Sequence, residues 1–231
     1  MKTFWSRWLG RIFPGGLFLP CPECGQRTRR AGTLCDNCLK QLHWIDDAEL
    51  EFIGNDDADA ATRPWQQAAA LFYYEHAGRD LMHRFKFQGH PELARPLGIL
   101  LAAKIRQLGL PVNAVCPIPM PRFRQWRRTY NQSELLAKVI SRELGLAYLP
   151  ILKRKNVSAK QALLNRKQRR RNPVGSFYFG RKHRIDADNC RLLLVDDIYS
   201  TGSTLREAAK VLHKSGLASL WIACCAVTPH R

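Results

Sequence analysis

Long hydrophobic runs are absent from this chain of 231 residues. No stretch approaches the roughly 20 apolar residues that a membrane-spanning helix needs. The N-terminus is not a convincing signal peptide, because Arg7 and Arg11 interrupt its apolar residues and no small-residue cleavage site follows. We therefore expect a cytoplasmic protein that is not an integral membrane protein.

Acidic residues are absent from one long segment. Residues 151–184 hold twelve Lys and Arg and no Asp or Glu, in a chain of net charge +18. Conversely, residues 41–62 hold seven acids and no Lys or Arg. A solvated charged face usually alternates its signs. The basic segment is therefore expected to lie near anionic material, either a pyrophosphate or a nucleic-acid backbone.

The length and the 45% hydrophobic content suit one α/β domain with a small appendage. We divide the chain into an N-terminal helix and cysteine module (1–45), an acidic linker (46–64) and a main domain (65–231). The acids could instead cover a basic surface when no partner is bound.

Four of the eight cysteines form two matched pairs near the start of the chain. They are Cys21, Cys24, Cys35 and Cys38, in the order C-x2-C, ten residues, C-x2-C. Two such pairs can present four thiolates to one tetrahedral metal. Two disulfides are one alternative, which a cytosolic location disfavours. A redox C-x-x-C is another, but one redox motif would not explain two matched pairs. We expect a structural zinc ion, since four thiolates leave no open position for a catalytic water.

Strand and helix patterns alternate through the main domain, which predicts a parallel sheet with flanking helices and ligands at the carboxyl ends of its strands. The predicted strands are 68–75, 113–119, 192–195 and 219–227, and the predicted helices are 78–89, 91–109, 133–145 and the segment after residue 202.

The most informative stretch is RLLLVDDIYSTGSTLREAAKVL, residues 191–212. An apolar run suited to a buried parallel strand leads into Asp196 and Asp197. Ser200, Thr201, Gly202, Ser203 and Thr204 then precede a helical pattern. Backbone N–H groups in such a loop attract a phosphate, and two carboxylates one strand end away can reach the hydroxyls of a sugar. An ordinary turn, with an Asp capping the helix, is the simpler alternative.

VDDIYSTGSTL resembles the phosphoribosyl-pyrophosphate (PRPP) motif of the type I phosphoribosyltransferase fold. The resemblance implies that Asp196 and Asp197 hold the ribose 2- and 3-hydroxyls and that residues 200–204 bind the 5-phosphate. It also implies Mg²⁺ with PRPP. Some proteins of this fold bind PRPP without turning it over, so catalysis by Asp196 and Asp197 stays open.

Three further stretches are similar to the ComF/GntX family, and most closely to its GntX branch. Residues 117–138 match a block that contains Arg128, Asn131 and Gln132, although Thr129 stands where the family normally has Gly. Residues 161–177 match a second block through residues that include Gln161, Arg166 and Arg169. Residues 85–98 match a third, with Lys86 at the family's lysine. The resemblance covers nearly the whole chain.

These matches suggest roles for several side chains. Lys86 and Arg128 are expected to bind PRPP. The pyrophosphate or nucleic-acid candidates are Arg166, Arg169, Arg170 and Arg171, because guanidinium groups bind phosphate in bidentate fashion. Asn131 and Gln132 either recognise a base or cap the following helix.

Family resemblance implies a role in the uptake or utilisation of extracellular DNA, as a nutrient or in competence. On this hypothesis a PRPP-binding domain contacts single-stranded DNA, with proteins of the DNA-uptake machinery as further partners. An active phosphoribosyltransferase in nucleotide salvage, releasing pyrophosphate from PRPP, is the second hypothesis. A PRPP-sensing regulator is the third.

Overall fold

The computed structural model describes residues 20–28, 33–53, 63–121, 129–155, 176–180, 186, 188–217 and 219–229. The predicted N-terminal helix lies outside the described residues. So do residues 156–175 and 181–184 of the basic segment.

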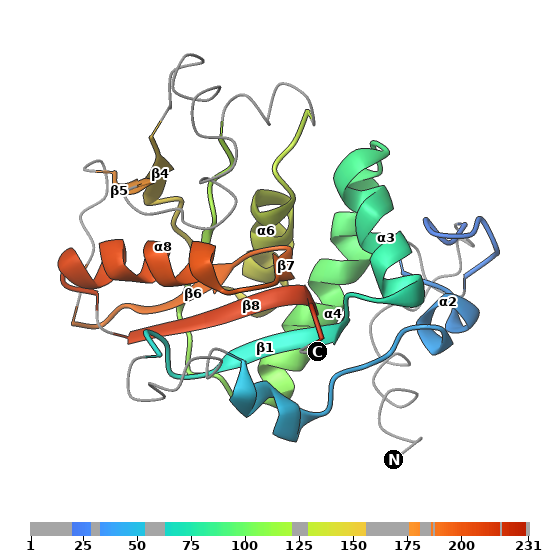
Figure 1. Ribbon diagram of the computed structural model, residues 1–231, viewed down its shortest axis with the longest axis horizontal. Coiled ribbons are helices and arrows are strands. Elements are labelled where there is room, and N and C mark those ends of the chain that lie inside the picture. The colour runs from blue at the N-terminus through green and yellow to red at the C-terminus, as the bar shows by residue number, and fades with distance from the viewer. Residues whose placement is uncertain are drawn as a thin grey trace.

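A six-stranded sheet, parallel throughout, forms the centre of the molecule (Figure 1). Its order is β1 (Ala68–Tyr73), β8 (Ser219–Val227), β6 (Arg191–Val195), β2 (Ala114–Pro117) and β3 (Ala147–Tyr148). The short strand β7 (Ile198–Tyr199) also pairs with β8, on the part of β8 that follows its pairing with β6. All but the first residue of β6 are buried, as expected of a strand covered on both faces. The predicted fold class, an α/β domain with a parallel sheet and flanking helices, is confirmed.

Alternate residues of each strand point to opposite sides of the sheet. Both sides carry apolar residues, and helices cover both. Leu193 and Val195 belong to the core that α3 (His76–Phe87), α4 (Ala94–Gln107) and α6 (Gln132–Leu144) complete. A short 3₁₀ helix, η3 (Pro91–Leu93), precedes α4. Leu192 and Leu194 face the opposite core, formed with α8 (Ser203–Lys214). The helices agree with the predicted ones to within three residues at each end.

The segment after the cysteines packs against β1. The module ends in α2 (Asp36–Lys40), and residues 43–45 then run antiparallel to β1, where the Ile45 N–H donates to the Leu71 carbonyl at 3.0 Å. The described part of the predicted acidic linker forms a 3₁₀ helix, η1 (Asp47–Phe52), whose Leu50 is fully buried. Residues 46–53 are thus packed on the main domain, while 54–62 lie outside the described residues.

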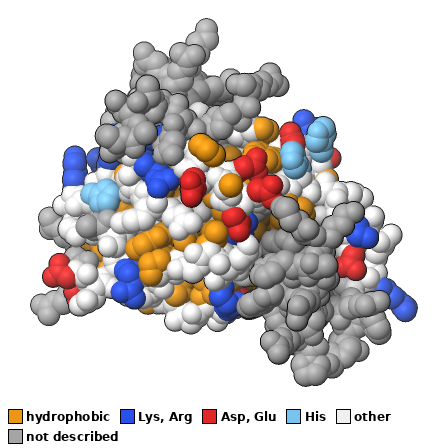
Figure 2. Space-filling view, turned by 90° about the horizontal axis from the view of Figure 1, so that it is seen from below, with side chains coloured by type: hydrophobic (Ala, Val, Ile, Leu, Met, Phe, Trp, Pro, Cys, Tyr) orange, Lys and Arg blue, Asp and Glu red, His pale blue; other side chains and the backbone are white. Residues whose placement is uncertain are grey.

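Acidic side chains gather on the lower face of the molecule, where η1 lies (Figure 2). Asp47 on η1 pairs with the ammonium of Lys104 on α4, whose side chain is only 5% exposed. The Asp47 carboxylate also accepts a hydrogen bond from the Gln107 amide at 2.8 Å. Part of the acidic segment therefore neutralises a buried cation of the main domain.

A separate antiparallel hairpin lies beside the sheet. It pairs β4 (Leu152–Arg154) with β5 (Phe177–Phe179), and the Lys155 N–H donates to the Ser176 carbonyl at 2.8 Å. The residues that flank segment 156–175 on either side are therefore held next to one another. Across the described ranges, none of the helices combines the length and apolar character that a membrane span requires.

We expect Asp47→Ala to lower the free energy of unfolding by about 1–3 kcal/mol, because the buried Lys104 cation loses its carboxylate partner. The matched control is Glu134→Ala, which removes an exposed i,i+4 pair with Lys138 and should cost about 0.3–0.5 kcal/mol. Urea denaturation of both variants measures the difference. Equal losses would contradict a structural role for η1.

Candidate functional site

Two adjacent carboxylates lie at the carboxyl end of β6, where the motif predicted them. Asp196 is half-buried and Asp197 is 8% exposed. One oxygen of Asp196 accepts hydrogen bonds from the Ser133 hydroxyl and from the Asp197 N–H, both at 2.9 Å. Burial, followed by the negative charge of Asp197, raises the pKa of Asp196 to about 6. A cation or hydroxyl donors at this position would favour the ionised form.

Lys86 supplies a cation from another element. Its ammonium lies 3.0 Å from an Asp197 carboxylate oxygen, and the two side chains are 17% and 12% exposed. Lys86 belongs to the last turn of α3, whose terminal carbonyls lack partners within the helix. The Tyr130 hydroxyl donates to the Phe85 carbonyl at 2.6 Å. These contacts place a positive charge beside the paired acids.

Asn131 and Gln132 hold neighbouring segments in place. The Gln132 amide is fully buried and donates to the carbonyls of Phe85 and Lys86 at 3.2 and 3.4 Å. The Asn131 amide donates to the Ile118 carbonyl at 3.0 Å, in the loop after β2. The Asn131 side chain makes no capping hydrogen bond to α6. Both residues therefore position the segments around the acids.

Thr129 adopts the conformation that the family's glycine would favour. Its φ is +62°, in the left-handed region that β-branched residues rarely occupy. The turn before α6 thus forms without glycine.

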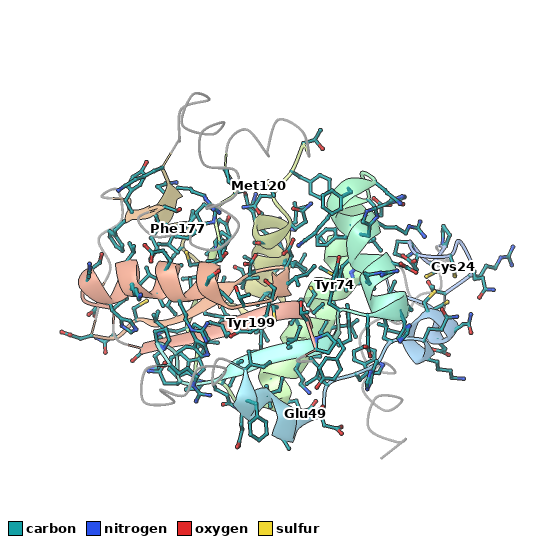
Figure 3. The ribbon with its side chains drawn as sticks, in the orientation of Figure 1. Cys24, Glu49, Tyr74, Met120, Phe177 and Tyr199 are labelled. Carbon is teal, nitrogen blue, oxygen red and sulfur yellow. The ribbon has the colours of Figure 1, made fainter. Side chains whose placement is uncertain are left out.

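The loop from Ser200 to Thr204 joins β7 to α8. Gly202 has φ +66°, and a Cβ there would lie 2.4 Å from the hydroxyl of the buried Tyr199. Thr201 donates to the Ser203 hydroxyl at 3.0 Å, and Arg206 donates to the Thr201 carbonyl at 2.6 Å. Glycine is therefore required here both for its backbone conformation and for the close approach of Tyr199 (labelled in Figure 3).

These elements surround one cavity of about 250 Å³. Its lining consists of Lys86, Ile118, Pro119, Met120, Pro121, Asn131, Gln132, Ser133, Arg154, Asp196, Asp197, Ile198, Ser200 and Thr204. The predicted Lys86, Asn131, Gln132, Asp196, Asp197, Ser200 and Thr204 are thus brought together, with Thr201, Gly202 and Ser203 in the adjoining loop. The predicted Arg128, Arg166, Arg169, Arg170 and Arg171 lie outside the described residues.

Sequence analysis did not single out Ser133 or Arg154 as site residues. Ser133 follows directly after the matched Asn-Gln pair, which was a usable signal. Arg154 lies in the acid-free segment, but nothing in its local sequence separates it from the other cations there. Its place in the cavity depends on the hairpin of β4 and β5.

The four predicted cysteines form a cluster that can hold a metal ion. Their sulfur atoms all lie within 4.8 Å of one another, and every cysteine in the described residues is a free thiol. Cys21 and Cys38 sulfurs are 4.0 Å apart, and those of Cys24 and Cys35 are 3.5 Å apart. Four ligands at the zinc–sulfur distance of about 2.3 Å in a tetrahedron would be about 3.8 Å apart, so the cluster fits such an ion.

Each C-x2-C pair has the local structure of a zinc knuckle, a tight turn that can present both sulfur atoms to one metal ion. Gly25 has φ +74° and its N–H donates to the Cys21 carbonyl at 2.8 Å. The N–H groups of Cys35 and Cys38 donate to the sulfurs of Cys21 and Cys35 at 3.4 and 3.5 Å. Such donors stabilise thiolates. The cluster lies at the edge of the molecule, with Cys24 exposed (Figure 3).

The cysteine module is joined to α3 by packing and by charge. Cys21, Cys35 and Cys38 belong to the same core as Leu81 and Phe85 of α3. The guanidinium of Arg84 lies 3.3 Å from a Glu23 carboxylate oxygen and also donates to the Glu23 carbonyl. The helix that carries Lys86 is therefore in direct contact with the module.

Three relatives align with most of the chain. It is 33% identical over 209 residues to Competence protein F of Haemophilus influenzae, covering 87% of this chain and 82% of that protein. DNA utilization protein YhgH of Salmonella typhi is 28% identical over 210 residues, with 88% and 82% covered. Competence protein ComFC of Bacillus subtilis is 26% identical over 200 residues, with 86% and 73% covered. No family model matches the chain.

Two solved structures are similar to part of the chain. Glutamine PRPP amidotransferase from B. subtilis, complexed with ADP and GMP, is 16% identical with a TM-score of 0.41. The match covers 62% of this chain and 30% of that chain. Adenine phosphoribosyltransferase from Leishmania donovani is 14% identical with a TM-score of 0.37, and 61% of this chain covers 55% of that one.

We expect the purified chain to bind one metal ion at the four cysteines. Cys24→Ser should lose it, because a hydroxyl is a poor replacement for a thiolate ligand. Cys24 is the exposed member of the cluster, so its replacement leaves no buried cavity. Elemental analysis after zinc loading and desalting gives the stoichiometry. Cys190→Ser, outside the cluster, is the control and should retain the metal; equal metal content in both variants would refute the site.

Proposed function

This chain belongs to the ComF/GntX family, and from that membership we propose that it acts in the uptake or utilisation of extracellular DNA, as a nutrient or in competence. The domain is proposed to bind PRPP or a related phosphoribosyl ligand. The observation that carries the proposal is one cavity that is lined by the paired carboxylates, by Lys86 and by residues of the loop 200–204, whose sequence is typical of a phosphate-binding loop.

PRPP presents a sugar with hydroxyls, a 5-phosphate and a pyrophosphate. We propose that Asp196 and Asp197 accept hydrogen bonds from the ribose hydroxyls. The loop 200–204 and the start of α8 would supply N–H groups to the 5-phosphate. The acids by themselves would repel the ligand. Lys86 and Arg154 reduce that repulsion, and Arg128 and Mg²⁺ are proposed to do the same at the pyrophosphate.

The four cysteines are proposed to hold structural zinc. Four thiolates fill a tetrahedral site, so this ion would have no open position for catalysis. A module of about 40 residues needs such a metal to stay folded. Its contact with α3 makes the metal a support for the helix that carries Lys86.

Single-stranded DNA is proposed to approach the side of the molecule that carries β4 and β5. Arg154 lines the cavity proposed for PRPP, and Lys155 and Ser176, which flank the central part of the basic segment, lie beside it. The acids on η1 gather on the lower face, away from β4 and β5 (Figures 1 and 2). The cations of the basic segment therefore favour the side of β4 and β5 for a polyanion.

Turnover of PRPP is the second candidate function. It is favoured by the paired acids, which could stabilise positive charge that develops on the sugar as pyrophosphate leaves. Such an enzyme would belong to nucleotide salvage and would release pyrophosphate when a nucleobase is supplied. Binding of PRPP with neither turnover nor DNA contact would instead favour a PRPP-sensing regulator.

Calorimetry with PRPP and Mg²⁺ should detect binding to the metal-loaded protein, and Gly202→Ala should weaken it at least about tenfold. The added methyl group would collide with Tyr199 and reshape the loop. Gly109→Ala is the matched control. Gly109 also has positive φ (+63°), but a methyl group there would meet no atom within 4 Å, and the residue has no place in the cavity. Absence of heat with the unaltered protein would refute the PRPP site.

Labelled single-stranded oligonucleotide should bind with an affinity that falls as salt rises. Replacement of Arg166, Arg169, Arg170 and Arg171 by Gln should weaken binding and lower the slope of log K against log salt by up to about 3, at about 0.7 per phosphate contact. The control removes four exposed cations elsewhere: Arg95, Arg142, Lys210 and Lys214. Equal effects of both sets would show that only total charge matters.

A further inference from the structure

A second cavity of about 460 Å³ adjoins the first. The two share Pro119, Met120, Asn131 and Arg154. Its lining includes residues of α6 and of the hairpin formed by β4 and β5, so the cavity lies between these elements. Met120, above α6, and Phe177, on the hairpin, are labelled in Figure 3. Its volume is within the usual range of about 300–1,000 Å³ for sites that bind small ligands. None of the roles proposed above uses this space.

Two aromatic residues line this cavity, Tyr148 and Tyr178, and strand alternation explains why Tyr178 is the exposed ring of β5. Phe177 is 3% exposed and belongs to the core, whereas Tyr178 is 47% exposed and lines the cavity. Tyr178 lies directly opposite Lys153 in the register of β4 and β5. Directly opposed residues of an antiparallel pair project on the same face, so a flat ring and an ammonium are presented together.

The remaining wall combines cations with an apolar surface. Lys138 and Glu134 pair with one another at 2.7 Å, which leaves the cationic excess of the cavity to Lys153 and Arg154. Leu152 and Pro117 contribute buried apolar surface. The aromatic ring and the apolar surface suit a nucleotide's base, because every base has a π-face that stacks on an aromatic ring. The cations suit its phosphate.

We propose that the second cavity binds one nucleotide of a single-stranded nucleic acid, with its base stacked on Tyr178 and a flanking phosphate at Lys153, which projects on the same face of the hairpin as that ring. This inference rests on the proposed function, since it names where the strand contacts the domain. Because Arg154 lines both cavities, the strand would pass beside the phosphoribosyl ligand.

Fluorescence anisotropy of a labelled oligothymidylate tests the proposal on the metal-loaded protein of 231 residues. Tyr178→Ala should weaken binding by about 5- to 150-fold, as expected for the loss of one base–aromatic stack. Tyr178→Phe keeps the ring and should bind within about twofold of the unaltered protein. The control Phe52→Ala removes an aromatic side chain that is 67% exposed on η1, away from the cavity, and should have no effect.

The salt dependence of binding distinguishes base stacking on Tyr178 from the phosphate contact of Lys153. Lys153→Gln should lower the slope of log K against log salt by about 0.7, the value of one phosphate contact to a single strand. Tyr178→Ala should leave that slope unchanged. Unchanged affinity of Tyr178→Ala, or an equal loss in Phe52→Ala, would overturn the proposal.

Two further measurements distinguish this inference from the proposed function. Tyr178→Ala should bind PRPP like the unaltered protein, so loss of PRPP binding would place Tyr178 in the other site and overturn the assignment. Thymidine monophosphate, the probe for a free nucleotide, should compete at least about tenfold more weakly than the oligonucleotide; tighter competition would overturn a strand as the occupant. Failure of the unaltered protein to bind any oligonucleotide would refute the proposed DNA contact itself.

Discussion

Two carboxylates side by side at the end of a buried strand require compensation, and much of the site is arranged around that requirement. Asp196 and Asp197 repel each other, and burial adds to the cost of their charge. Lys86 from α3, Ser133 from α6 and a backbone N–H offset this cost. Three elements that are distant in sequence must therefore meet at one point.

The helix α3 connects this point to the cysteine module. Arg84 pairs with Glu23 of the module, and two residues later Lys86 pairs with Asp197. Gln132 holds the carbonyls at the end of the same helix. A disturbance of the module would thus be transmitted to the cavity through packing and hydrogen bonds rather than through a flexible connection.

Acidic and basic residues lie in different segments of the chain, and the two segments have different roles in the fold. Part of the acidic segment packs as η1 and neutralises the buried Lys104, so its acids are not simply a solvated linker. The basic segment instead includes both strands of a hairpin next to two adjoining cavities. The same chain therefore carries acids where they stabilise the domain and cations beside the proposed ligands.

Sequence by itself determined the features that depend on near neighbours. The apolar run into Asp196 and Asp197, the glycine of the following loop and the spacing of the cysteines each specify their local structure, because strand pairing, positive φ and knuckle geometry are set within a few residues. Tertiary structure alone decided the packing of residues 46–53, the role of Gln132 and the place of Arg154. Each of these depends on contacts with segments far along the chain, and no local pattern encodes which distant segment will be the partner.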